Sequence, residues 1–342
     1  MNQGNQQTTT GEMRASAPFD IVVSIINYCT GEMTIACVES VLEDLRETPD
    51  ANICVVVVDN ASGDGSAEAI DEWIDTQPSG TPVRLVRSPT NSGFSGGHNQ
   101  GIAAAQGRYY LLLNSDSLLR VGFCRALLTA ADAAPQTGLF APRIEHEDGT
   151  QQVSCFRIQT PASELIRGAA TGFVTKFLSS HDVPLALPPA ADQVGWSSFA
   201  GILLRDAMVQ AVGPMDEGYF LYFEDTAYCL QAARAGWGIS YVPEARFVHF
   251  RGGSAPVKSL ARVGKQLPKY YYASRTRFFF QAHGWGGLIA ANLLWHLGRG
   301  IGTLRLLAGK QRPKAIVGEW RDIWTNVLTP LGDDYAPKDR VE

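Results

Sequence analysis

A run of six residues, Ile-Cys-Val-Val-Val-Val at 53–58, constrains the fold of this chain more than any other feature. Consecutive β-branched residues leave no polar face, which is typical of a strand covered by helices on both sides of a parallel sheet. Three more apolar runs, at 19–28, 83–87 and 109–113, have the composition of strands, and apolar residues at helical spacing fill 33–46. Alternating strands and helices of this length predict an α/β domain built from βαβ units around a mostly parallel sheet.

The remaining segments are less regular, and they predict a mixture of helices, strands and connections. We expect helices at 66–75 (capped by Ser66), from near Gly97 to Gln106 and at 224–236, a strand at 239–242, and a flexible or lid-like connection around the proline-rich part, 184–189, of a mixed segment at 139–204.

Charge and cysteine content limit the classes of partner and compartment. The 342 residues carry a formal net charge of −5, which argues against a general nucleic-acid-binding protein because phosphate neutralisation needs a basic surface. The six cysteines are scattered without a Cys-x-x-Cys pair, so structural thiols in a reducing compartment are favoured over disulfides or a metal site. Residues 1–18 are polar and lack the apolar core of a secretory signal, so we expect a short disordered leader and a cytoplasmic protein.

The chain changes character after residue 265. YYYASRTRFFF at 270–280 and LIAANLLWHLGRGIGTLRLL at 288–307 mix aromatic, leucine and arginine residues. The apolar stretch 288–297 is too short to span a bilayer. We therefore predict an α/β domain at 19–265 and a helical C-terminal extension at 266–342. The extension either lies at a membrane surface, where Arg275 and Arg277 would face the lipid, or packs on the domain, or makes a homodimer contact.

Polar clusters follow several of the expected strands, at the edge where parallel sheets bind ligands. Asp59 ends the valine-rich strand, and it either accepts hydrogen bonds from a nucleoside or belongs to an ordinary turn. The segment NSGFSGGHN at 91–99 contains three glycines, which either let the backbone approach a phosphate ahead of a helix or simply form a turn. Asn114, Ser115 and Asp116 follow another strand, so Asp116 either holds a divalent cation against a diphosphate or helps to cap the next helix.

Two further candidates lie nearer the C-terminus. Glu224 and Asp225 open an expected helix, where the helix dipole favours acids. The aromatic residues before them would also remove water from a carboxylate and raise its pKa toward that of a general base. His249 is either a structural residue or a ligand.

The order of these motifs resembles that of the inverting glycosyltransferases of family two, which have the GT-A fold. The resemblance covers residues 19–255 and implies that 19–265 is a GT-A type, nucleotide-diphospho-sugar-binding domain. The matching segments are VDNASGDGS at 58–66, NSGFSGGHNQGI at 91–102, LLNSDS at 112–117 and GYFLYFEDTAYCLQAARAGWGISYVPEARFVHFRGGS at 218–254.

The resemblance implies a binding site for the sugar donor. Asp59 would contact the nucleoside. Asn91, Gly93 and Asn99, with the loop between them, would bind the nucleotide side of the donor.

It also implies a cofactor, Mg²⁺ or Mn²⁺. Asn114, Ser115 and Asp116 occupy the Asp-x-Asp position of the family, so the first two would lie against the donor and Asp116 would bind the metal. His249 matches a position that ligates metal in some relatives, and an imidazole suits Mn²⁺ as well as Mg²⁺. Because Asn114 replaces the first Asp, metal binding would rest mainly on Asp116.

The implied reaction is a single in-line displacement with inversion at the anomeric carbon. Asp225 would be the general base, and Glu224 would position the acceptor or the base. The pattern is most similar to bacterial rhamnosyltransferases of cell-wall and surface-polysaccharide synthesis. This similarity implies dTDP-rhamnose as donor and a lipid-diphosphate-linked sugar as acceptor, with the protein at the inner face of the membrane.

Rival functions have less support in the sequence. A nicotinamide-dependent oxidoreductase would need a glycine fingerprint after the first strand, and a sugar nucleotidyltransferase would need a basic glycine-rich loop there; residues 29–33 provide neither. A UDP-sugar-dependent transferase remains an alternative. So does a homologue that binds the donor without catalysis, which the Asn at position 114 favours and the intact Asp116, Glu224 and Asp225 oppose.

Overall fold

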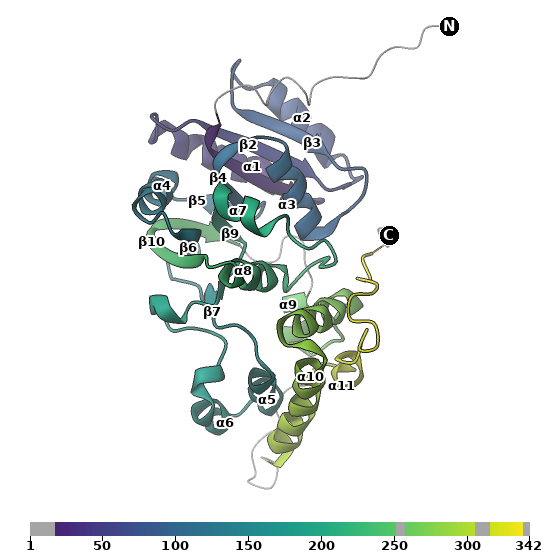
Figure 1. The fold of residues 1–342 in the computed structure, drawn as a ribbon. Helices are drawn as coiled ribbons and strands as arrows, with labels where there is room; N and C mark the ends of the chain where they lie inside the picture. Colours follow the sequence, from purple (N-terminus) through teal and green to yellow (C-terminus); the bar gives the residue numbers. More distant parts are fainter. Residues whose placement is uncertain (1–17, 251–256, 305–314, 338–342) are drawn as a thin grey trace, which may run out of the picture.

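A mostly parallel, eight-stranded sheet forms the centre of the protein (Figure 1). The computed structural model describes residues 18–250, 257–304 and 315–337; nearly all of the expected leader lies outside these ranges. The predicted α/β architecture is confirmed. In the order in which they pair, the strands are β3 (Val83–Arg87), β2 (Ile53–Asp59), β1 (Phe19–Asn27), β4 (Gly107–Asn114), β9 (Gly201–Arg205), β6 (Thr137–Glu145), β10 (Gly238–His249) and β5 (Ser117–Leu119).

Six of these strands run in the same direction. β1 to β4 pair in parallel, and β6 and β10 continue that direction beyond β9, which is antiparallel to both β4 and β6. Short β5 closes the sheet antiparallel to β10. The carboxyl ends of β1, β2, β4 and β10 therefore lie at one edge, where Asp59, Asn114 and His249 end their strands.

Helices cover both faces of the sheet, as the continuous apolar strands require. β2 is buried along its whole length. One core layer contains side chains of α1 (Gly31–Arg46), α2 (Ser66–Asp75) and α4 (Phe123–Ala133). The opposite layer contains side chains of α3 (Gly93–Ala103), α7 (Asp206–Val212) and α8 (Glu224–Arg234).

Helix α3 begins earlier than predicted, at Gly93 instead of near Gly97. The glycines Gly97 and Gly101 therefore lie inside the helix, and they serve close packing on β1. A Cβ on Gly97 would come within 2.8 Å of Ile26, and one on Gly101 within 2.1 Å of the Ser24 hydroxyl. Two of the helix's glycines are thus explained by packing against a strand and need no ligand.

Other boundaries differ for local reasons. β10 has twelve residues instead of the predicted four, because register shifts let it follow β6 past Val242 and then pair with β5. The proline-rich segment near 184–189 is tied to β7 (Cys155–Phe156), since the amide of Leu185 donates to the Cys155 carbonyl. It is a paired connection and not a free lid.

A second layer of helices lies below the sheet in Figure 1. It comprises α5 (Pro161–Ala169) and α6 (Gly172–Phe177), which follow β7, and the C-terminal helices α9 (Val257–Val263), α10 (Lys269–Leu304) and α11 (Glu319–Asp322); β8 (Trp196–Ser197) pairs with β7.

Helix α10 is kinked at Gly284, whose backbone is not helical (φ +68°). It packs against α5 and also contacts α8. Arg275 is buried and Arg277 is largely so, which contradicts the placement of these two side chains at a membrane surface and agrees with a helix packed on the α/β domain. Among the described helices, none has the length and apolar character needed to cross a bilayer.

Candidate functional site

A buried amide, Asn27, connects the ends of β1, β2 and α1. Its Nδ2 donates to Oδ1 of Asp59 (2.7 Å) and to the hydroxyl of Ser66 (2.8 Å). Its Oδ1 accepts from the hydroxyls of Thr30 and Thr34, at 3.2 and 3.0 Å. Asn27 and Asp59 are also register partners in the sheet. Sequence reasoning missed Asn27; a buried amide that ends a strand was the available signal.

Asp59 is held in this network with capacity to accept more hydrogen bonds. Oδ1 accepts from Asn27 and from the hydroxyl of Ser62 (2.6 Å), whereas Oδ2 accepts from one described group, the Ser62 amide, at 3.2 Å. An ionised carboxylate oxygen has two lone pairs, so Oδ2 can still accept from a ligand. This geometry suits the predicted contact with a nucleoside.

Asn60, the next residue, fixes the predicted donor loop. Its Nδ2 donates to Oδ1 of Asn91 (3.0 Å) and to the carbonyl of Gly93 (2.9 Å), and its Oδ1 accepts from the Ser92 amide. Gly93 has φ +68°, and a Cβ there would come within 2.2 Å of the Phe220 carbonyl oxygen. Gly93 is therefore required both by its backbone conformation and by its close approach to the segment before α8.

Asn99 lies on the same helix and joins it to that segment. Its Nδ2 donates to the Met215 carbonyl and to the Glu217 carboxylate, both at 2.9 Å, and its Oδ1 accepts from the Met215 amide. Both ends of the side chain are thus engaged within the protein. The nucleotide contact expected of Asn99 stays a prediction.

Asp116 and His249 meet at the carboxyl edge of the sheet. Oδ1 of Asp116 lies 3.2 Å from Nε2 of His249, and Nδ2 of Asn114 lies 3.4 Å from the same nitrogen. The Ser115 hydroxyl is 3.0 Å from that of Thr30, which connects this loop to the Asn27 network. Four predicted residues therefore lie together although up to 135 positions separate them in the chain.

The Asp116–His249 pair fits part of a divalent-metal site. A carboxylate oxygen and an imidazole nitrogen are ligands that both Mg²⁺ and Mn²⁺ accept, Mn²⁺ more readily for the nitrogen. Within the described ranges, no group of three or more His, Cys, Asp or Glu side chains is arranged to hold a metal ion. A metal here would therefore need oxygen ligands from a bound diphosphate or from water.

Glu224 and Asp225 begin α8 after two residues with unusual backbone. Tyr222 and Phe223 have φ values of +72° and +67°, a left-handed conformation that costs about 1–2 kcal/mol per residue for side chains of this size. Such strain persists where surrounding packing holds it, and it is common at functional sites. It turns the chain sharply, so that two acids lie at a helix N-terminus.

The two acids have different surroundings. Glu224 is buried, and its Oε2 has no hydrogen-bond partner among the residues that the structure describes. Burial, and secondarily the charge of Asp225, raise the pKa of Glu224 well above its usual value. Asp225 is half-buried, and its Oδ1 accepts from the Thr226 amide at 2.7 Å. Glu224 therefore favours its neutral form, whereas the neighbouring Asp225 is more accessible.

Helix α10 holds the strained segment in place. The Ser274 hydroxyl donates to the Leu221 carbonyl (3.1 Å), and Arg277 binds both oxygens of Asp216, at 2.9 and 3.1 Å. The ring of Phe223 contacts those of Tyr271 and Phe278. The extension thus helps to position the candidate acids, which the sequence alone did not indicate.

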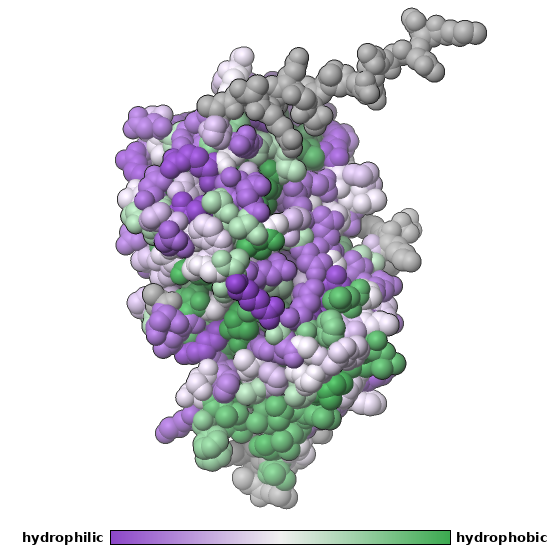
Figure 2. All heavy atoms as spheres, in the orientation of Figure 1, coloured by the Kyte–Doolittle hydropathy of each residue, from purple (hydrophilic) through white to green (hydrophobic). Residues whose placement is uncertain are grey.

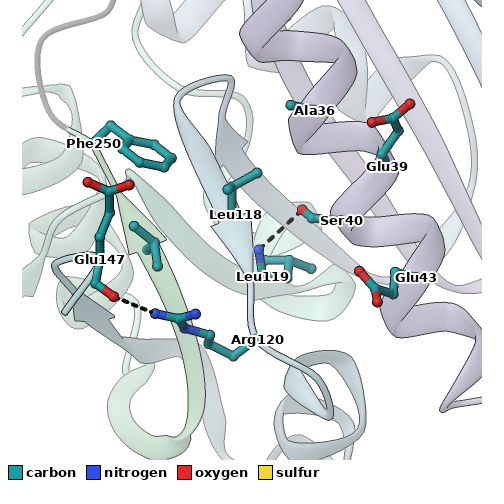
Figure 3. A pocket seen from close by; sticks show the side chains of 10 residues that line it. Ala36, Glu39, Ser40, Glu43, Leu118, Leu119, Arg120, Glu147 and Phe250 are labelled. Carbon is teal, nitrogen blue, oxygen red and sulfur yellow. Dashed lines mark hydrogen bonds between the residues drawn. The ribbon is translucent and has the colours of Figure 1, made fainter. Parts of the chain in front are cut away.

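Two surface hollows adjoin the end of β10. The larger, of about 470 Å³, lies between α1 and β5 and contains none of the predicted site residues (Figure 3). The smaller, of about 390 Å³, is lined by His249, Phe250, Asp148 and Thr150 among others. The smaller hollow therefore opens beside the Asp116–His249 pair, and it is the one that bears on the site.

Comparisons with known proteins relate this chain to glycosyltransferases. Residues 20–172 match the sequence model of Glycosyl transferase family 2. Over 286 residues, 78% of this chain and 86% of the relative, the chain is 28% identical to the N-acetylglucosaminyl-diphospho-decaprenol L-rhamnosyltransferase of Mycobacterium tuberculosis (strain CDC 1551 / Oshkosh). It is 31% identical to the succinoglycan biosynthesis protein ExoO of Rhizobium meliloti (strain 1021) over 115 residues, 34% of this chain and 30% of that protein.

Solved structures support the fold. The mannosyltransferase PcManGT from Pyrobaculum calidifontis, solved in complex with GDP-Man and Mn²⁺, superposes with a TM-score of 0.51 at 15% identity, covering 92% of this chain and 86% of that one. The predicted GT-A type fold with a helical C-terminal region is thereby confirmed. The match of residues 20–172 and the similarity over most of the chain both point to the family 2 glycosyltransferases.

Proposed function

We propose that this protein transfers a sugar, with inversion, from a nucleotide diphosphate donor to a lipid-linked acceptor in bacterial glycan synthesis. The observation that carries the proposal is the meeting of Asp116 and His249 at the same sheet edge as Asp59. One carboxylate there suits a nucleoside, and the pair beside it suits a metal-bound diphosphate. The two contacts together suit a nucleotide diphosphate.

In this proposal the donor lies along the carboxyl edge of the sheet. Asp59 accepts a hydrogen bond from the base or ribose through Oδ2. Asn91 and Gly93, held by Asn60, line the nucleotide side together with Asn99, whose contribution includes fixing the 215–217 segment. Asn114 and Ser115 lie against the diphosphate.

Asp116 and His249 are the residues that would hold Mg²⁺ or Mn²⁺. When bound, such a metal offsets the negative charge that develops on the departing nucleoside diphosphate. The side chain of Asn114 can present its amide oxygen by a half-turn and add a weak ligand. A family relative with two Asp residues at this motif would bind the metal more tightly.

Asp225 is the proposed general base. It takes the proton of an acceptor hydroxyl, whose oxygen attacks the anomeric carbon from the face opposite the nucleotide. The bond from that carbon to the diphosphate oxygen breaks as the new glycosidic bond forms, so the configuration inverts. Glu224 stays neutral beside it, which keeps the second negative charge away from Asp225 and lets Glu224 donate a hydrogen bond that orients the acceptor.

The similarity to a mycobacterial rhamnosyltransferase supports dTDP-rhamnose as the donor and a lipid-diphosphate-linked sugar as the acceptor. A lipid-linked acceptor places the reaction at the inner face of the membrane. Transfer of another hexose, for instance from a UDP-sugar, is the second candidate, since one relative over 67% of this chain is the low-salt glycan biosynthesis hexosyltransferase Agl10 of Haloferax volcanii.

A donor screen tests the proposal. The pure protein is incubated with Mg²⁺ or Mn²⁺ and a panel of UDP-, GDP- and dTDP-sugars, and both binding and slow hydrolysis are recorded. Selective, metal-dependent release of dTDP from dTDP-rhamnose is expected. Preference for a UDP-sugar would discard rhamnose and keep the reaction class, whereas binding without any release or transfer would support the inactive homologue.

A further inference from the structure

Helix α6 exposes two large apolar side chains to solvent. Phe173 and Phe177 are 82% and 80% exposed, and their spacing of four residues places them on the same face of the helix. Lys176 lies beside them and is also exposed. Single exposed apolar residues are ordinary, but two phenylalanines that share a face form the start of a patch.

The second half of α10 also exposes apolar side chains. Leu293, Leu297 and Leu304 are each more than half exposed, and their spacing of four and seven residues follows one face of the helix. Between Gly284 and Leu304 the only Lys, Arg, Asp or Glu is Arg299. A surface helix with so few charged residues on its outer face is poorly suited to contact with bulk water.

These two sets form one region at the lower end of the molecule. The small core beneath it joins Ile166 of α5, Val174 of α6 and Ile301 of α10, so the three helices are neighbours there. Figure 2 shows a continuous hydrophobic area at this end, in contrast to the mostly hydrophilic surface over the sheet. We call the exposed side chains of Phe173, Phe177, Leu293, Leu297 and Leu304 the apolar end.

The two sequence segments that build the apolar end are poor in acidic residues. From Ala245 to Gly318 the sequence contains thirteen lysines and arginines and not one aspartate or glutamate, although the whole chain has a net charge of −5. From Leu165 to His181, around α6, there is likewise no acidic residue. Neither of the two segments that build this surface contains an aspartate or a glutamate.

We propose that the apolar end docks onto an anionic lipid bilayer. The phenylalanines of α6 and the leucines of α10 insert at the interface, while Lys176 and Arg299 lie near anionic headgroups. A second copy of this chain would fit less well, because two acid-poor, basic surfaces of like charge would repel each other. Since no described helix can span the membrane, the contact is a peripheral one.

The docking surface and the candidate site share a helix. The first half of α10 holds the segment before α8 through Ser274 and Arg277, and the second half, beyond the kink at Gly284, carries three leucines of the apolar end. Docking therefore fixes the orientation of the site relative to the membrane. This consequence rests on the proposed lipid-linked acceptor, but the docking itself does not.

Vesicle binding of the full chain tests the proposal. Co-sedimentation is measured with phosphatidylcholine vesicles and with vesicles that contain phosphatidylglycerol. We expect binding to the anionic vesicles that weakens with salt, and at least a tenfold loss of affinity for the double variant Phe173→Glu/Phe177→Glu. Lys176→Glu should give a smaller loss. The matched control is Val121→Glu, which changes an equally apolar, 65% exposed residue between β5 and α4 and should bind as the wild type does.

Metal-dependent hydrolysis of the donor by water provides the second readout. The phenylalanine variant should keep it, since neither residue contacts the donor edge; this also shows that the variant is folded. Equal binding of wild type and variant, or equal binding to neutral and anionic vesicles, would overturn the docking proposal. So would a wild-type dimer that the phenylalanine variant dissociates while vesicle binding is absent. If the wild type shows no donor hydrolysis, that result would count against the proposed function and not against the docking.

Discussion

The carboxyl edge of the sheet and the contact between α5 and α10 are both buried and polar, but they are built from different groups. At the sheet edge, one carboxylate, Asp59, is surrounded by amides and hydroxyls. Between the helices, Glu164 accepts from Arg167 and Arg275, and Arg167 also binds Glu319, so that two carboxylates face two guanidinium groups.

The difference in charge balance separates a ligand site from a structural contact. Among the residues that the structure describes, no lysine or arginine pairs with Asp59, so its charge is available to a ligand's N–H or O–H groups. The helical cluster balances its own charges and is closed by Asn292, which accepts from Arg275 at 2.7 Å. An unbalanced, hydrogen-bonded carboxylate thus marks the donor edge, and a balanced ionic cluster marks the scaffold.

The largest expected effect comes from breaking the ionic cluster. Arg275→Met should lower the free energy of unfolding by about 3–5 kcal/mol, because it removes one partner from a buried ion pair. Urea unfolding measures the change. The control is Arg108→Met, whose ion pairs with Asp20 and Asp132 are at the surface and should be worth at most about 1 kcal/mol. Similar losses in the two variants would show that the cluster does not hold the helices together.

Removing the hub of the sheet edge should have the next largest effect. Asn27→Ala removes one hydrogen bond from Asp59 Oδ1 and one from each of the Thr30 and Thr34 hydroxyls, which should cost about 3 kcal/mol in unfolding free energy, at about 1 kcal/mol per lost hydrogen bond. Nucleotide affinity should fall as well, because Asp59 is no longer oriented. A stable variant with unchanged nucleotide affinity would contradict the role assigned to the network.

The close approach of Gly93 to the segment before α8 can be tested with a matched pair of glycines. Gly93→Ala and Gly80→Ala both place alanine at positive φ, but nothing lies within 4 Å of a Cβ at Gly80. The control should lose about 1 kcal/mol of stability from backbone strain, and Gly93→Ala about 2 kcal/mol, with overpacking against Phe220 as the additional cost. Sugar transfer should fall only in Gly93→Ala. Equal activities of the two variants would show that the close approach to Phe220 does not matter for transfer.

The pH dependence of stability should have opposite signs for Glu224 of the candidate site and Glu164 of the helical cluster. Because its pKa is raised in the folded state, Glu224 stabilises fully below about pH 4.5 and this contribution is lost as the pH rises. Despite the opposing effect of burial, Arg167 and Arg275 lower the pKa of Glu164 to about 2, so its contribution is present above about pH 4.5 and is lost as the pH falls toward 2.

Glu224→Gln isolates the first of these effects. Above about pH 5 its unfolding free energy should decline less steeply than that of the wild type, by up to about 1.4 kcal/mol per pH unit for one proton. Urea unfolding between pH 5 and pH 8 measures both slopes. Parallel curves would show that Glu224 does not hold a proton in the folded protein.

Local sequence was enough for the sheet and for the residues at its edge. The strands at 53–58 and 83–87 are confirmed, because continuous β-branched segments have few alternatives to a buried parallel strand. The residues Asn114, Asp116 and His249 come together as the ends of parallel strands require. The expected start of α3 was wrong, since the side chain of Asn60 fixes residues 91–93 from another strand.

The helical layer could not be predicted in the same way. Arg275 and Glu164 are 111 residues apart in the chain, and nothing in the local sequence of either shows that it is paired and buried. The contacts of α10 with Tyr222 and Phe223 also depend on that packing. The roles of Asp225 and of the metal pair remain proposals, because they concern ligands that the chain alone does not contain.

The most direct test of the central claim is the rate of sugar transfer by Asp225→Asn. The control is Asp206→Asn, which changes another acid in the first turn of a helix, α7. We expect Asp225→Asn to bind the donor nucleotide as the wild type does and to lose about 10²–10⁴-fold in kcat, the usual contribution of a general base, while Asp206→Asn keeps its activity. Near-normal transfer by Asp225→Asn, with donor binding intact, would contradict the assignment of Asp225 as the base.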